Sequence, residues 1–167
     1  MKVKTIFNLF LLFFICAICF SCAPGQTINT QIKGNLNSKK KILIASKKSK
    51  FKDDIIYDVQ YALEQVDAYV KIIDLLKLTE EKSEDYNAIV ILNDYKFLKF
   101  NINVRKFLQN TPSSEKEKII LITTSGSSTP PKIEGVDAIA SASNVSDTGY
   151  ISEIIIEKVY AILDISI

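Results

Sequence analysis

The sequence NAIVIL, residues 87–92, decides the fold, and Asn93, Asp94 and Tyr95 follow it directly. Four other runs share its apolar character, namely residues 41–46 (KILIAS), 69–75 (YVKIIDL), 118–124 (KIILITT) and 137–142 (DAIASA). None of the five alternates regularly between apolar and polar residues, which is typical of strands covered on both faces. Each run therefore predicts a buried strand, and we expect NAIVIL near the centre of the sheet.

Segments with helical periodicity lie between several of these runs. Apolar side chains recur at helical spacing in residues 52–66, 104–110 and 151–163. Residues 76–85 are polar and acidic and predict a solvated loop or a short helix, whereas the Gly-, Ser- and Pro-rich residues 125–135 predict an irregular crossover. Because strands and helices alternate within one small chain, the sequence predicts an α/β domain with a doubly wound parallel sheet.

Residues 1–21 have the features of a signal peptide. Lys2 and Lys4 give a positive start, and residues 6–20 are apolar apart from Asn8. This apolar run is shorter than the roughly 20 residues that a membrane-spanning helix needs. We therefore expect residues 1–21 to be absent from the mature protein.

Cys22 stands at the end of this segment, directly after the small residue Ser21. The arrangement resembles a bacterial lipoprotein signal, which implies a palmitate-type lipid on Cys22 and a domain held on a membrane of the cell envelope, outside the cytoplasm. An ordinary secretory signal is the alternative, and the choice between inner and outer membrane stays open. Residues 22–38 are polar and aperiodic, so they predict a flexible tether before a domain at 39–167.

Composition excludes several classes of function. Without residues 1–21 the numbers of basic and acidic residues are equal, so no overall charge favours nucleic-acid binding. The chain has no histidine, which excludes Ser-His-Asp and Cys-His catalysis and histidine-ligated metals. We predict no catalytic residue and no metal site, and an enzymatic role would depend on carboxylates, lysine, tyrosine, hydroxyl groups or an organic cofactor.

Seven lysines fall between positions 39 and 52. One interpretation is a patch that binds anions or lipid headgroups close to a membrane. The other, which we favour, is a solvated loop whose charge is balanced by Asp53 and Asp54 in the first turn of the following helix.

Four motifs resemble the flavodoxin family. They are VKIIDL (70–75), DYNAIVIL (85–92), VRKFL (104–108) and IILITTSG (119–126), and the resemblance extends from residue 41 to the end of the chain. It implies a flavodoxin-like, open five-stranded parallel sheet with strand order 2-1-3-4-5 and helices on both faces. It also implies non-covalent binding of FMN, with a role in electron transfer or in the reduction of small molecules.

The resemblance places FMN at three loops that follow strand ends. The candidate cofactor-binding residues are Ser46, Lys48 and Ser49 in the first loop, Asn93 and Tyr95 in the second, and Thr124, Ser125 and Gly126 in the third. The first two loops depart from the family pattern, because the chain has no glycine between Gly34 and Gly126. Glycine lets backbone N–H groups close around a phosphate without a Cβ in the way, so its loss argues against an intact site.

These departures lead to two hypotheses. The first is a membrane-anchored, non-catalytic binding or structural module with a degenerate FMN site. The second is an FMN-binding, flavodoxin-type electron-transfer protein or reductase with a divergent phosphate site. Phe97, Leu98 and Phe100 in the 93–101 loop would offer an apolar patch to a protein partner, or would merely plug the vacated cleft.

Overall fold

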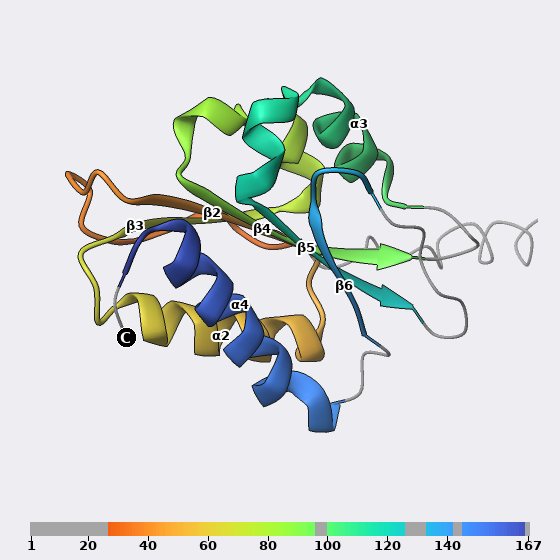
Figure 1. Ribbon diagram of the computed structural model, residues 1–167. Helices are drawn as coiled ribbons and strands as arrows, with labels where there is room; N and C mark the ends of the chain where they lie inside the picture. The colour runs from red at the N-terminus through yellow and green to blue at the C-terminus, as the bar shows by residue number, and fades with distance from the viewer. Residues whose placement is uncertain (1–26, 96–99, 126–132, 142–144, 166–167) are drawn as a thin grey trace, which may run out of the picture.

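The computed structural model describes residues 27–95, 100–125, 133–141 and 145–165 of the 167-residue chain. These residues form one sheet with helices on both of its faces (Figure 1). The expected signal peptide, Cys22 and Gly126 lie outside the described residues. Within the described part of the chain, no helix is both long enough and apolar enough to cross a membrane.

Five parallel strands make up most of the sheet, and a sixth strand joins them at one edge. The strands are β1 (Gln31–Gly34), β2 (Lys41–Ser46), β3 (Tyr69–Asp74), β4 (Ala88–Tyr95), β5 (Ile119–Ser125) and β6 (Asp137–Ser141), in the spatial order β1-β3-β2-β4-β5-β6. The five parallel strands follow the predicted order 2-1-3-4-5, which confirms the α/β fold class. Strand β4, which contains most of NAIVIL, pairs with β2 and β5 near the centre.

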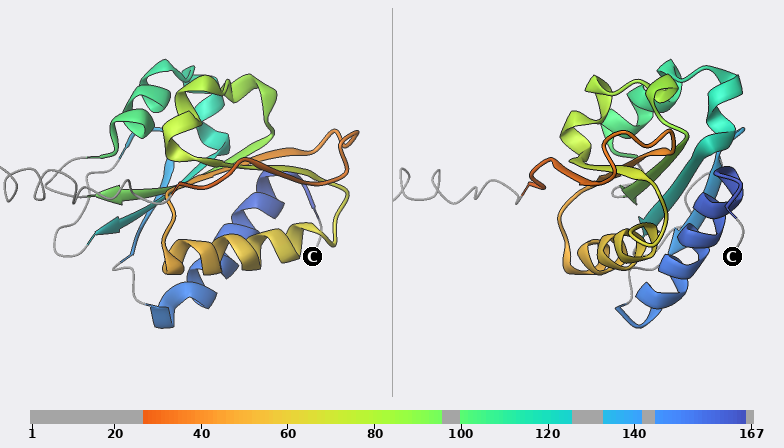
Figure 2. Two further views of the ribbon diagram at one scale, coloured as in Figure 1. Left: turned by 180° about the vertical axis from the view of Figure 1, so that it is seen from behind. Right: turned by 90° about the vertical axis from the view of Figure 1, so that its left-hand side faces the viewer.

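The helices lie in two layers, which the turned views of Figure 2 separate clearly. The α-helices are α2 (Lys50–Leu63), α3 (Ile102–Asn110) and α4 (Thr148–Ile162), and the short 3-10 helices are η1 (Leu75–Glu80), η2 (Ser83–Asp85), η3 (Ser113–Lys118) and η4 (Val145–Asp147). Helices α2 and α4 cover one face, whereas α3 and η1 cover the other. The predicted coverage of both faces is therefore confirmed.

Two apolar layers fill the space between the sheet and these helices. Neighbouring side chains of a strand point to opposite faces. Ile42 and Ile44 of β2 therefore pack towards α2 and α4, whereas Leu43 and Ala45 pack towards α3 and η1. Burial on both faces explains why β2, β4 and β5 show no alternation between apolar and polar residues. The prediction of a buried strand at residues 137–142 is wrong in this respect, because β6 lies at the edge of the sheet and its residues are mostly exposed.

The segment predicted as a flexible tether contains strand β1, so residues 31–34 do not belong to a tether. Strand β1 pairs antiparallel with β3, and nearby the Ile28 N–H donates a hydrogen bond of 2.9 Å to the Asp74 carboxylate. All four residues of β1 are exposed, so backbone hydrogen bonds hold the strand and the sequence carries no apolar signal for it. At the end of β1, Gly34 has φ +75°, and a Cβ there would lie 2.1 Å from the Ala68 carbonyl oxygen.

Tyr86 is a buried member of the layer that faces α3. Its hydroxyl donates a hydrogen bond to the Glu81 carboxylate, which also accepts one of 2.8 Å from Lys71. Burial, with smaller contributions from the hydrogen bond and charge of Glu81, raises the pKa of Tyr86 far above its usual value. In the unfolded chain the phenol loses its proton near pH 10, so above about that pH the folded state binds more protons and stability falls as pH rises.

Replacing Tyr86 by phenylalanine should therefore flatten the alkaline loss of stability. The wild-type free energy of unfolding should carry an extra slope approaching about −1.4 kcal/mol per pH unit above about pH 10, which the variant lacks. Urea unfolding followed by circular dichroism across that pH range measures the difference. Tyr61→Phe, at a side chain exposed on α2, is the matched control and should keep the wild-type slope. Equal slopes for Tyr86→Phe and the wild-type protein would contradict the assignment.

Candidate functional site

The carboxyl ends of β2, β4 and β5 meet at one rim of the sheet, where the side chains facing α2 become polar. The register places Asp94 of β4 beside Thr124 of β5, and Ser46 ends β2 beside Leu92. Because side chains alternate along a strand, Ser46, Asp94 and Thr124 continue the apolar rows that pack against α2 and α4. Open α/β sheets bind ligands just outside such a rim, so these residues form the candidate site.

Lys52 is a buried cation at this rim. It belongs to the first turn of α2, and only 2% of it is exposed. Its Nζ forms an ion pair with Asp94 Oδ1, and the same oxygen accepts a hydrogen bond of 3.1 Å from Thr124 Oγ1. We call Lys52, Asp94 and Thr124 the rim cluster. It joins the start of α2 to the ends of β4 and β5 through charge and hydrogen bonds.

The sequence predicts Lys52 as the first residue of a helix and also counts it among the lysines of a solvated, charge-balanced loop. The helix is confirmed, whereas the solvated position is wrong for this residue. Lys52 stands three residues before Ile55 and seven before Val59, both of which are buried. At 3.6 residues per turn, these spacings put all three side chains on one face of the helix. The helical periodicity itself could therefore have identified Lys52 as a buried cation that needs an acidic partner.

Three of the predicted cofactor-binding residues use their side chains within the protein. Ser46 is fully buried, and its Oγ donates to the Lys47 carbonyl oxygen at 3.1 Å. The Ser49 hydroxyl caps α2 by accepting from the Lys52 N–H at 3.3 Å. Thr124 belongs to the rim cluster. The structure thus brings Ser46, Ser49 and Thr124 to one rim, as expected, but as parts of the protein's own hydrogen-bond network.

Asn93 lies on the opposite face of the sheet, towards α3. Its Oδ1 accepts a hydrogen bond of 3.3 Å from the Asn101 N–H. Its Nδ2 is buried and has no hydrogen-bond partner among the described residues, and the same is true of Oγ1 in Thr123, its register neighbour on β5. A buried polar atom without a partner costs about 1–3 kcal/mol, so these two atoms offer hydrogen bonds to a water molecule or a ligand.

Tyr95 and Ser125 end their strands half-buried, next to each other in the register. The Tyr95 ring packs edge-on against Phe100, with ring centroids 5.3 Å apart and an interplanar angle of 63°. Phe100 is itself half-buried against the layer that faces α3, so it packs within the protein. Phe97 and Leu98, the other members of the expected apolar patch, lie outside the described residues.

The described part of the rim does not fit the phosphate of FMN. A phosphate at a helix N-terminus needs small residues and an excess of positive charge. Here α2 begins with Lys50, Phe51 and Lys52; the Phe51 side chain is buried in the core, and the Lys52 charge is paired with Asp94. The Asp94 carboxylate would also repel a phosphate placed in the same space. Nor do the described residues bring together three or more His, Cys, Asp or Glu side chains that could hold a metal ion.

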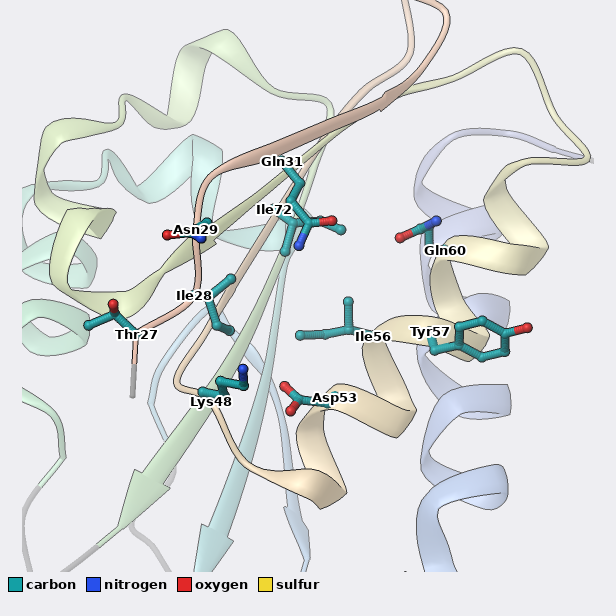
Figure 3. A pocket seen from close by; sticks show the side chains of 10 residues that line it. All are labelled: Thr27, Ile28, Asn29, Gln31, Lys48, Asp53, Ile56, Tyr57, Gln60 and Ile72. Atoms are coloured by element: carbon teal, nitrogen blue, oxygen red, sulfur yellow. The ribbon is translucent and has the colours of Figure 1, made fainter. Parts of the chain in front are cut away.

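Lys48 belongs to a different site, a pocket of about 320 Å³ between the N-terminal segment and α2 (Figure 3). Asp53 and Tyr57 of α2 line it, together with Ile72 of β3 and residues that lead into β1. Sequence reasoning missed this pocket because one of its walls comes from the segment predicted as a tether. Lys48 thus lines a pocket to which none of the other described candidate cofactor-binding residues contributes.

Comparisons with known proteins support the fold and nothing finer. No protein-family model and no curated protein matches the sequence. A solved flavodoxin from the domain Archaea superposes with a TM-score of 0.50 at 13% identity, covering 73% of this chain and 98% of the flavodoxin. An oxidoreductase from Corynebacterium diphtheriae superposes with a TM-score of 0.51, also at 13% identity, covering 77% of this chain and 100% of the oxidoreductase. The chain therefore has a flavodoxin-like fold.

Proposed function

We propose that this protein is a membrane-anchored, non-catalytic module whose flavodoxin-like domain has a degenerate FMN site. The observation that carries the proposal is the rim cluster. Lys52 and Asp94 form an ion pair at the position where a flavodoxin-like fold would otherwise direct positive charge and free N–H groups at a phosphate. The carboxylate of Asp94 takes the electrostatic place of the ligand.

The energetics of the cluster support this reading. Displacing Asp94 from Lys52 would remove an ion pair from an ammonium group whose side chain is only 3% exposed, and a charge in such a place needs its pairing and hydrogen bonds. An incoming phosphate would have to replace Asp94 as that partner, and the expelled carboxylate would stay beside it on β4. FMN would therefore gain less from this site than from a rim with an unpaired cation.

The anchor remains a proposal from the sequence, and the position of the first described residue bears on its geometry. Five peptide units link Cys22 to Thr27, which already lines the pocket beside α2. A fully extended chain of that length spans at most ~18 Å. A lipid on Cys22 would therefore hold the domain close to the membrane surface. The linker between lipid and domain would be much shorter than a tether formed by residues 22–38.

Palmitate labelling of the expressed chain tests the anchor. We expect the wild-type protein to incorporate labelled palmitate and to fractionate with membranes, whereas Cys22→Ser should do neither. A labelled Cys22→Ser variant, or an unlabelled wild-type protein, would contradict the proposed lipid site.

The alternative, an FMN-binding electron-transfer protein or reductase, has one specific observation in its favour. Within the part of the chain that the structure describes, Asn93 Nδ2 and Thr123 Oγ1 are buried without partners at the same rim, and such atoms often mark a ligand site. They lie on the α3 side, where a flavin edge could accept their hydrogen bonds. The flavodoxin and the oxidoreductase among the structural neighbours are consistent with this alternative. At 13% sequence identity, however, the likeness concerns the fold and gives no support from individual site residues.

Flavin binding separates the two functions. The full chain, purified in a mild detergent, should carry no flavin absorbance and should not quench FMN fluorescence at FMN concentrations up to about 100 µM, a range that would reveal affinities down to about −5 kcal/mol. The archaeal flavodoxin in the same detergent would serve as a positive control for the assay. Bound or co-purified FMN would overturn the proposal and establish the alternative.

A further inference from the structure

The pocket between the N-terminal segment and α2 has a preformed wall. The Ile28 N–H is held by Asp74, a buried carboxylate whose other oxygen accepts from the Leu76 N–H at 2.9 Å. The Ile28 side chain packs against the core together with Ile56 of α2. Strand pairing between β1 and β3 then fixes the chain that follows. A site with fixed walls can bind a small ligand without first ordering its own backbone.

Two opposite charges line this pocket from different elements. Lys48 comes from the loop that follows β2, and Asp53 from the first turn of α2 (Figure 3). They form no ion pair with each other, and neither side chain hydrogen-bonds to any other described residue. Both charges therefore remain available to a ligand that carries the complementary pair.

The rest of the lining suits a short, partly polar skeleton. Ile28, Ile56 and Ile72 give an apolar floor, and Tyr57 stands at the side with 69% of its surface exposed. Asn29, Gln31 and Gln60 add carboxamides to the lining, and those of Gln31 and Gln60 lie on the same side of the N-terminal segment in Figure 3. The volume of about 320 Å³ is close to the lower limit of ordinary ligand pockets, roughly 300 Å³, which fits a molecule of metabolite size.

We propose that this pocket binds a small zwitterion, with its ammonium group on Asp53 and its anionic oxygens on Lys48. The apolar floor would contact the short skeleton that joins the two charged groups. Two sources share this chemistry: a free amino acid and the phosphoethanolamine headgroup of a membrane lipid. The pocket lies apart from the rim cluster, so the inference does not depend on whether FMN is bound.

Titration calorimetry of the full chain in a maltoside detergent tests the proposal with defined probes. We expect L-alanine, glycerophosphoethanolamine or both to bind with a dissociation constant below about 1 mM, and the singly charged probes glycerol phosphate and ethanolamine to bind at least about tenfold more weakly. Binding of L-alanine alone identifies the free amino acid as the source, and binding of glycerophosphoethanolamine alone identifies the lipid headgroup. No heat from either zwitterion up to about 10 mM, or equal affinity for a singly charged probe, would overturn the proposal.

Matched substitutions then assign the two charges. Lys48→Gln and Asp53→Asn should each weaken binding of the zwitterion at least about tenfold. Lys47→Gln and Asp54→Asn change the same charges one position away, at residues that do not line the pocket, and should leave the affinity unchanged. Circular dichroism confirms that each variant is folded. Equal losses in the control variants would show a general charge effect and would also overturn the proposal.

Discussion

Replacing Asp94 by asparagine is expected to lower the free energy of unfolding by about 2–4 kcal/mol. The substitution keeps the volume of the side chain but removes the negative charge that Lys52 contacts. The ammonium group of Lys52, whose side chain is only 3% exposed, would then lie at the rim without the negative charge of Asp94. The value lies below that for a fully buried pair because the Asp94 side chain is 23% exposed and water screens part of the interaction. Urea unfolding at neutral pH measures the change.

The chain provides a matched control for this experiment. Lys158 and Asp137 form an ion pair in which both side chains are more exposed, at 34% and 43%. Asp137→Asn should therefore cost only about 0–1 kcal/mol. Adding Lys52→Met to Asp94→Asn should recover part of the loss, since methionine fills the space without a charge. Equal costs for Asp94→Asn and Asp137→Asn would show that the rim cluster is no more than a surface contact.

The five parallel strands could be predicted from the sequence because their signal is local. Strands β2, β4 and β5 are apolar runs buried on both faces, as Ile89 and Val90 of β4 show, and no distant contact is needed to recognise that pattern. Strand β6 was located correctly, but its residues are mostly exposed. Strand order followed from the resemblance to a known family. The closing helix could be predicted for the same reason, since Ile151, Ile155 and Val159 repeat at helical spacing and face the core.

Strand β1 could not be predicted, because the interactions that hold it in the sheet do not depend on a pattern of apolar side chains in its own sequence. Its residues are exposed, and its place is set by backbone pairing with β3, by the hydrogen bond from Ile28 to Asp74 and by the close approach of Gly34 to Ala68. All three depend on residues more than thirty positions away. The pocket was missed as a direct consequence.

The candidate site was predicted in part. The described strand ends, at Ser46, Asn93 and Thr124, lie at one rim as predicted, and the loss of glycine from the first loop was visible in the sequence. The interaction partners of these side chains could not be predicted from the sequence. Lys52 and Asp94, for example, are 42 positions apart and meet only when α2 packs on the sheet. The same packing decides the role of Phe51, because it places this ring in the core between the sheet, α2 and α4.

Replacing Phe51 by alanine is therefore expected to lower the free energy of unfolding by about 3–5 kcal/mol. The ring is only 6% exposed, so its removal leaves a cavity among core side chains and takes away the apolar contact that holds the first turn of α2 on the sheet. Tyr61→Ala removes an aromatic ring from the same helix at a side chain that is 61% exposed, and it should change the free energy of unfolding by at most about 0.5 kcal/mol. Urea unfolding of both variants, with FMN fluorescence as a second measurement, checks the prediction.

A Phe51→Ala protein that is as stable as Tyr61→Ala and has gained affinity for FMN would show that the ring fills a flavin site. A strongly destabilised protein without FMN affinity would show that the position has become part of the core.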